Sequence, residues 1–129
     1  MSIFNVGEFK LANISLHPFK IDCDALTDED WQSIAYIVSR NYVFDDVFSI
    51  ETGGNKLAQA LQKYRHPSPV HATRALIVDD VLTTGGSMES LKQKLQQEYD
   101  NIQGFVLFSR TTPPDWVRSL FHLNPNINY

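Results

Sequence analysis

The residues best suited to chemistry in this 129-residue chain form one continuous run over positions 75–87. Four apolar residues lead into two adjacent carboxylates, Asp79 and Asp80. Open α/β sheets bind ligands at the carboxyl ends of their strands, so a buried strand here would carry both acids to a ligand site. Two neighbouring carboxylates repel each other, and hydroxyl donors or a cation relieve that repulsion. A sugar diol together with Mg²⁺ meets both needs, because Mg²⁺ takes few protein carboxylates and keeps several waters.

The turn that follows the acids predicts a phosphate site. Its residues are Thr83, Thr84, Gly85, Gly86 and Ser87. At the start of a helix, the free backbone N–H groups, the hydroxyls and the positive end of the helix dipole form a cup for an anion. The alternative is an ordinary strand, turn and helix in which the hydroxyls only cap the helix. We favour the ligand site, because 13 contiguous residues fit the pattern. The run lacks the Gly-Lys-Thr of a Walker P-loop, and it predicts a phosphorylated sugar as the ligand.

Residues 75–87 resemble, at every position, the phosphoribosyl-pyrophosphate (PRPP) binding motif of type I phosphoribosyltransferases. The resemblance implies that Asp79 and Asp80 form the catalytic pair, approach the ribose hydroxyls and hold Mg²⁺ indirectly. It also implies that residues 83–87 bind the 5-phosphate. One strand and helix upstream, a second segment stands where the family keeps its pyrophosphate loop, with residues Glu51, Thr52, Gly53 and Gly54. Glycines there would let backbone amides approach a diphosphate.

The N-terminal segment, residues 7–22, looks like the hood of the orotate phosphoribosyltransferases. Those enzymes have a lysine beside the pyrimidine where this chain has Ala12, which predicts that orotate is a poor substrate. Phe19 and Lys20 are candidate base contacts from the hood, and Trp116 is a candidate for stacking on the base. The alternative for Phe19 and Lys20 is a strand that faces the core. The alternative for Trp116 is a tryptophan packed in the core or at an interface.

Only residues 65–74 separate the second expected helix from the strand of the motif. Members of this branch of the family insert a further strand and a mobile lid at this point, and ten residues cannot hold both. The segment concentrates basic side chains, namely Arg65, His66, His71 and Arg74. We interpret it as a short cationic flap over pyrophosphate, and a solvated loop is the alternative.

The rest of the pattern predicts the elements that position these residues. Thr27 is expected to cap a helix over 28–40, with acids in the first turn. Further helices are expected over 54–64 and 87–99, and strands over 47–50, 75–78 and 104–108. Continuous apolar runs are typical of parallel strands that are buried on both faces. The alternation predicts an α/β fold with a mostly parallel sheet flanked by helices. The resemblance implies that this fold is similar to type I phosphoribosyltransferases, with a small N-terminal hood.

Length and composition predict one domain. The resemblance divides it into a hood over 1–26, an α/β core over 27–110 and a tail over 111–129. Eleven basic residues against 15 acidic ones give a net charge of −4, which argues against nucleic acid as a partner. The single cysteine, Cys23, cannot form an internal disulfide, as in proteins of a reducing cytoplasm. No apolar stretch approaches the roughly 18 residues that span a bilayer. We therefore expect a cytoplasmic protein with no membrane partner.

The motif over 75–87 and the resemblance that it carries imply transfer of phosphoribose from PRPP to a nitrogenous base, with Mg²⁺ and with release of pyrophosphate. A homodimer is expected, because short sheets with exposed edges favour association. Two alternatives follow from the short segment over 65–74. One is a non-catalytic sensor of PRPP or a nucleotide, and the other is a subunit whose partner chain supplies the lid.

Overall fold

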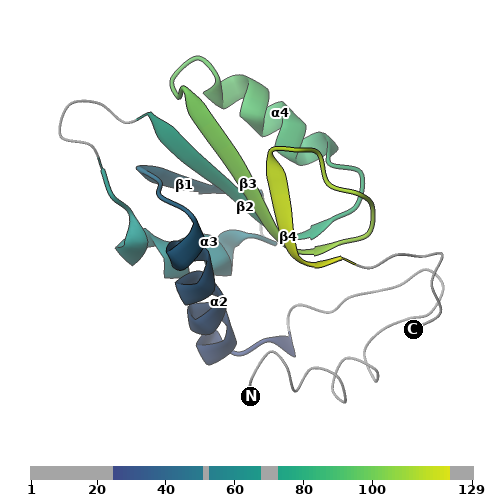
Figure 1. Ribbon diagram of the computed structural model, residues 1–129. Coiled ribbons are helices and arrows are strands. Elements are labelled where there is room, and N and C mark those ends of the chain that lie inside the picture. Colours follow the sequence, from purple (N-terminus) through teal and green to yellow (C-terminus); the bar gives the residue numbers. More distant parts are fainter. Residues whose placement is uncertain (1–24, 51–52, 68–72, 123–129) are drawn as a thin grey trace.

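Four strands form one parallel sheet that lies between two layers of helices (Figure 1). The computed structural model describes residues 25–50, 53–67 and 73–122, so the predicted hood lies almost wholly outside the described residues. The strands follow one another across the sheet in the order β1 (Asp46–Ser49), β2 (Arg74–Leu82), β3 (Asn101–Ser109) and β4 (Val117–His122). The helices are α2 (Asp28–Asn41), α3 (Asn55–Leu61), which continues into the 3-10 turn η3 (Gln62–Tyr64), and α4 (Gly86–Leu95). This arrangement confirms the predicted α/β fold.

Helix α2 begins directly after Thr27, the residue predicted to cap it. The Thr27 hydroxyl accepts the Asp30 amide at 3.1 Å, and the Asp30 carboxylate accepts the Thr27 amide at 3.0 Å. This reciprocal capping box satisfies two amides that the helix itself leaves without acceptors. Trp31, Ile34 and Val38 form the buried face of the helix. In the described part of the chain, no helix combines the length and the apolar character that crossing a membrane requires.

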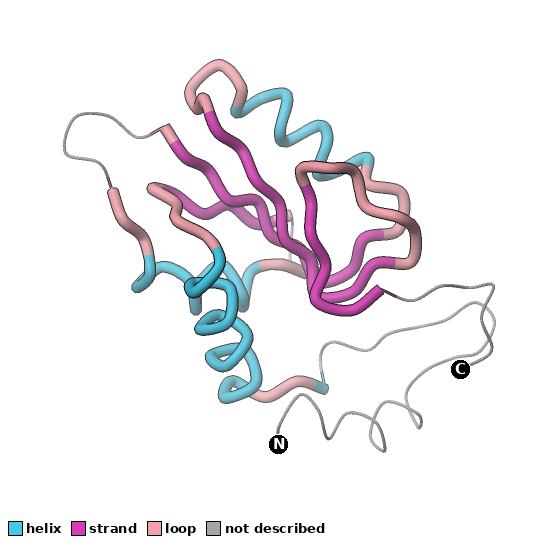
Figure 2. The backbone as a smooth tube through the Cα atoms, viewed as in Figure 1, coloured by secondary structure: helices cyan, strands magenta, loops and turns pink. Residues whose placement is uncertain are grey.

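The residues of β2 alternate between two apolar cores, one on each face of the sheet. Leu76 and Val78 pack with the apolar side chains of α2 and α3, whereas Ala75 and Ile77 pack with Met88 of α4. Figure 2 shows α2 and α3 on one side of the strands and α4 on the other. Because both faces are covered, every position of this run is apolar, as predicted for a parallel strand.

β2 is longer than the strand predicted over 75–78. It continues through Asp79 and Asp80 to Leu82, which pairs with Ser109 of β3. The prediction ended the strand before the first charged residue. In the fold, the long neighbouring strand β3 keeps the pairing intact past the acids, so both acids belong to the strand itself.

The tail predicted over 111–129 contributes strand β4 to the sheet, so the α/β core does not end at residue 110. β4 pairs in parallel with β3. The connecting residues 110–116 form no helix. Parallel neighbours are usually joined by a longer, helical crossover, which is why the sequence did not indicate this strand.

The helix predicted over 87–99 ends early, at Leu95, and the chain then turns to bring Tyr99 to the start of β1. The Tyr99 hydroxyl donates a hydrogen bond to the Asp46 Oδ2 at 2.6 Å. Burial and, next, this hydrogen bond to a carboxylate raise the pKa of Tyr99 to about 12. The contact joins the end of α4 to the amino end of the sheet.

We expect the Tyr99 hydrogen bond to stabilise the fold at neutral pH and to be lost in strong alkali. Because the folded chain favours the protonated phenol, its contribution is complete below the ordinary pKa of 10.0 and is lost as the pH rises through about 12. Tyr99→Phe should lower the free energy of unfolding by about 1 kcal/mol at neutral pH. Urea unfolding of both chains at stepped pH measures this difference. A difference that stays constant up to the highest pH would contradict the assignment.

Candidate functional site

Asp79 and Asp80 lie near the carboxyl end of β2, and Gly53 lies directly against them. A Cβ atom added at Gly53 would stand 2.6 Å from Asp80 Oδ1 and 3.0 Å from Asp79 Oδ1. The Asp80 amide donates to Asp79 Oδ1 at 2.8 Å, and the Val81 amide donates to Asp80 Oδ1 at 2.7 Å. Such charge-assisted bonds hold the carboxylate oxygens close to the backbone. The fold thus brings the predicted acid pair together with a glycine of the predicted pyrophosphate loop.

Gly54 determines how closely the chain after β1 approaches β2. A Cβ atom at Gly54 would lie 2.5 Å from the Val78 carbonyl oxygen. The Ile50 amide donates to that same oxygen at 3.0 Å, and the Gly54 amide donates to the Ile50 oxygen at 3.3 Å. The turn from β1 into α3 therefore packs against the backbone of β2 just before the acids. Glu51 and Thr52, the other two residues of the predicted loop, lie outside the described residues.

The predicted phosphate cup is the turn between β2 and α4. Gly85 has a φ of +83°, in the left-handed region that favours glycine. The Gly86 amide donates to the Thr84 hydroxyl at 3.3 Å. The amides in the first turn of α4 have no acceptor within the helix. Beside them lies a hollow of about 40 Å³, lined by Asp79 and by residues 81–88, so the cup and one of the acids share one small space.

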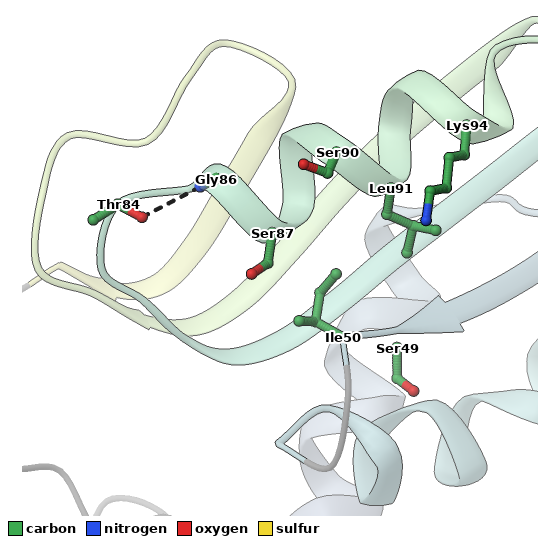
Figure 3. Close-up of a pocket in the computed structure, with 8 residues that line it drawn as sticks. All are labelled: Ser49, Ile50, Thr84, Gly86, Ser87, Ser90, Leu91 and Lys94. Atoms are coloured by element: carbon green, nitrogen blue, oxygen red, sulfur yellow. Dashed lines mark hydrogen bonds between the residues drawn. The ribbon is translucent and has the colours of Figure 1, made fainter.

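A larger groove of about 600 Å³ opens beside the cup, between α4 and the end of β1 (Figure 3). Three residues line both hollows, namely Thr84, Gly86 and Ser87. The other residues of the groove are Ser49 and Ile50 from β1 and its end, and Ser90, Leu91 and Lys94 from α4. The sequence prediction missed these five, although the α4 residues follow Ser87 at the spacing of one helix face.

The carboxylates of Asp79 and Asp80, near the end of β2, suit a cation that is bound largely through its substrate. Mg²⁺ typically takes one or two protein carboxylates and completes its shell with waters and substrate phosphates. Among the described residues, no three His, Cys, Asp or Glu side chains converge as a metal site of their own. Of the described residues at this edge of the sheet, Asp79 and Asp80 are the carboxylates that could help to hold such a cation.

Arg65 and Arg74 lie at the amino end of the sheet, so the cationic flap predicted from them was wrong. Arg74 begins β2, about 17 Å along the strand from Asp79. Its Nε donates to the Asp45 carboxylate at 2.9 Å, and Arg65 pairs with Asp46 at 3.0 Å. The physical reason is topological. In a parallel sheet, the connection from a helix into the next strand enters at the amino end, opposite the ligand edge.

His66 lies at the same amino end as the arginines. Its backbone amide donates to the Phe44 oxygen at 2.8 Å, and its carbonyl oxygen accepts from Arg74 at 2.9 Å. The predicted flap therefore does not form from this residue either. Three further candidates lie outside the described residues, namely Phe19, Lys20 and His71.

Trp116, the remaining candidate base contact, is held by side chains of α4. Its indole Nε1 donates to a Glu89 carboxylate oxygen at 3.0 Å, and the Lys92 ammonium lies 4.9 Å from its ring centroid. A Cβ atom at Gly104 would stand 2.9 Å from the indole ring. These contacts account for the tryptophan as a packing residue between α4 and the sheet, which was the alternative to base stacking.

Several solved structures share this architecture. Orotate phosphoribosyltransferase from Aeropyrum pernix has a TM-score of 0.62 and 20% identity, over 81% of this chain and 78% of that one. Orotate phosphoribosyltransferase from Mycobacterium tuberculosis, in complex with inorganic phosphate, has a TM-score of 0.64 and 16% identity, over 85% and 81%. Adenine phosphoribosyltransferase from Leishmania donovani has a TM-score of 0.64 and 12% identity, over 81% and 70%. No protein-family model and no curated protein sequence matches this chain.

Proposed function

Because this chain has the fold of the type I phosphoribosyltransferases, we propose that it binds PRPP with Mg²⁺ and transfers the phosphoribosyl group to a nitrogenous base. One observation carries the proposal. The acid pair, the glycine turn packed against it and the cup at the start of α4 meet at one edge of the sheet. This is the edge where open α/β sheets bind ligands.

The transfer breaks the bond between ribose C1 and a pyrophosphate oxygen and forms a bond from C1 to a base nitrogen. The ribose passes through a cationic, oxocarbenium-like state, which fixed charges and dipoles stabilise without reorganising. We assign Asp79 and Asp80 to the ribose hydroxyls, where their charge also favours the cationic ring. Mg²⁺, when bound at the diol, would neutralise the charge of the leaving pyrophosphate.

The two phosphate ends of PRPP are assigned to different parts of the site. The amides at the start of α4 and the hydroxyls of Thr83, Thr84 and Ser87 would hold the 5-phosphate. Gly53 and Gly54 would bring backbone amides to the pyrophosphate. Anchoring both ends fixes C1 relative to the incoming base, which reduces the entropy lost on reaching the transition state.

Asp79→Asn and Asp80→Asn should each weaken PRPP binding by roughly ten- to a hundredfold, because the loss of a charge-assisted hydrogen bond costs about 1.5–3 kcal/mol. Inorganic phosphate, which engages only the cup, should bind nearly as tightly as to the parent chain. Calorimetry with PRPP and Mg²⁺ measures the first effect, and the amide shifts of Thr84 to Ser87 follow the second. Equal losses for both ligands would contradict the assignment of the acids to the ribose.

A PRPP-binding protein without transfer activity is the second candidate function. It is favoured by the placement of Arg65 and Arg74 at the amino end of the sheet. In lid-bearing enzymes, closure of the lid excludes water from the reacting ribose. Arg65 and Arg74 lie too far from the acids to cover the ribose in this way, which would impair transfer more than binding.

A turnover assay over a panel of purines and pyrimidines separates the two functions. Because Ala12 stands where orotate enzymes have a lysine, we expect little activity with orotate. The homodimer and the cytoplasmic location remain predictions from the sequence.

A further inference from the structure

The described residues that line the groove beside the cup offer hydroxyl groups and one cation, and none of them is a carboxylate. Its eight described lining residues include one threonine and three serines together with Lys94. The chain as a whole has a net charge of −4, whereas the one charged side chain among these lining residues, Lys94, is positive. A concave surface of this kind attracts anions and offers them hydrogen-bond donors.

Lys94 lies on the wall of this groove that α4 provides. Ser87, Ser90, Leu91 and Lys94 all line the groove, on the side of α4 that faces Ile50 (Figure 3). Helical side chains lean toward the helix N-terminus, which carries the Lys94 ammonium back in the direction of the cup. Within the described part of the chain, neither ion pair involves Lys94.

We infer that Lys94 is a second anion contact, which binds the pyrophosphate group of a ligand whose 5-phosphate occupies the cup. This inference rests on the proposed function. Seven positions separate Ser87 from Lys94, which is about 10 Å along the helix axis. That span suits a sugar with an anionic group at each end better than a single phosphate. The opposite wall, Ser49 and Ile50, leads toward the turn that places Gly53 against the acids.

The chemistry of the ligand also calls for a cation at this place. A diphosphate carries several negative charges, and charge-assisted bonds from an ammonium are about twice as strong as bonds from neutral donors. Asp79, which lines the adjoining hollow of the cup, adds negative charge to the space that the ligand would occupy, and this makes a compensating cation more valuable. The two arginines that the sequence offered for this role are paired with Asp45 and Asp46 at the other end of the sheet.

Lys94→Gln tests the inference with two ligands that differ only in the pyrophosphate, PRPP and ribose 5-phosphate. We expect PRPP affinity in the presence of Mg²⁺ to fall about tenfold. The affinity for ribose 5-phosphate should change less than about twofold, because this ligand does not reach Lys94. Lys92→Gln is the matched control. Lys92 lies on the same helix, but its ammonium is over the Trp116 ring, and both affinities should stay unchanged.

The possible outcomes separate this inference from the proposed function. If the parent chain binds PRPP but Lys94→Gln changes neither affinity, or lowers both equally, the inference is overturned and the proposed function stands. If the parent chain binds neither ligand, the proposed function is overturned. Inorganic pyrophosphate then tests the groove directly. Amide shifts at Ser90, Leu91 and Lys94 that disappear in Lys94→Gln would support the contact, and unchanged amides would overturn it.

Discussion

Asp45→Asn is expected to lower the free energy of unfolding by about 3 kcal/mol, while the PRPP affinity of the folded chain stays unchanged. The Asp45 side chain is fully buried, with 0% exposure, and pairs with Arg74 at 2.9 Å. Its Oδ2 also accepts the backbone amides of Thr73 and Arg74, at 3.2 and 2.9 Å. An asparagine removes the charge and places an NH₂ donor among these donors. At least one buried donor then loses its acceptor, which is costly in a dry interior.

The neighbouring acid provides the control for this substitution. The Asp46 side chain is 28% exposed, and its partner Arg65 is 37% exposed. Exposed ion pairs contribute little, so Asp46→Asn should cost about 1 kcal/mol, including the weakened bond from Tyr99. Urea unfolding measures both variants, and calorimetry with PRPP measures binding. If Arg74→Ala lowered turnover but not stability, Arg74 would belong to the site after all, as the flap prediction held.

Gly54→Ala is expected to lower PRPP affinity by more than about tenfold and to destabilise the chain by about 1–3 kcal/mol. The added Cβ would lie 2.5 Å from the Val78 oxygen and 3.2 Å from the Asp79 Cα, both of them backbone atoms of β2. Neither atom can rotate away, because Val78 belongs to the central ladder of the sheet and is paired on both sides. The glycine turn must therefore move, and the contact between Gly53 and the acid pair is lost.

Gly86→Ala is the matched control for the effect on stability. The nearest atom to a Cβ at Gly86 is the Thr84 hydroxyl oxygen at 3.7 Å, which is an ordinary contact. Gly86 begins α4, where alanine favours the helix, so the free energy of unfolding should stay the same or rise slightly. Calorimetry and urea unfolding of both variants test the comparison. A Gly54→Ala chain that binds PRPP like the parent would show that the glycine turn does not shape the site.

The local features of this protein could be predicted from its sequence because their causes lie within a few residues. The Thr27 cap, the apolar run of β2 and the glycine and hydroxyl turn before α4 each depend on backbone preferences and periodicity along one short segment. The order of helices and strands then restricts the sheet to parallel neighbours. These features were sufficient to predict the α/β fold and to select Asp79, Asp80 and the cup.

The tertiary structure decided which residues meet at the site, because pairing across the sheet joins positions far apart in the chain. The continued pairing of β2 with β3 kept the acids within a strand, and the parallel topology sent Arg74 to the opposite end. The tail joined the sheet as β4, and the sequence did not indicate this because no helical pattern precedes the strand. Gly53 came against the acids, and Lys94 came to line the groove, only through the packing of separate elements. Periodicity says which face of an element is apolar, but three-dimensional packing determines what its polar face meets.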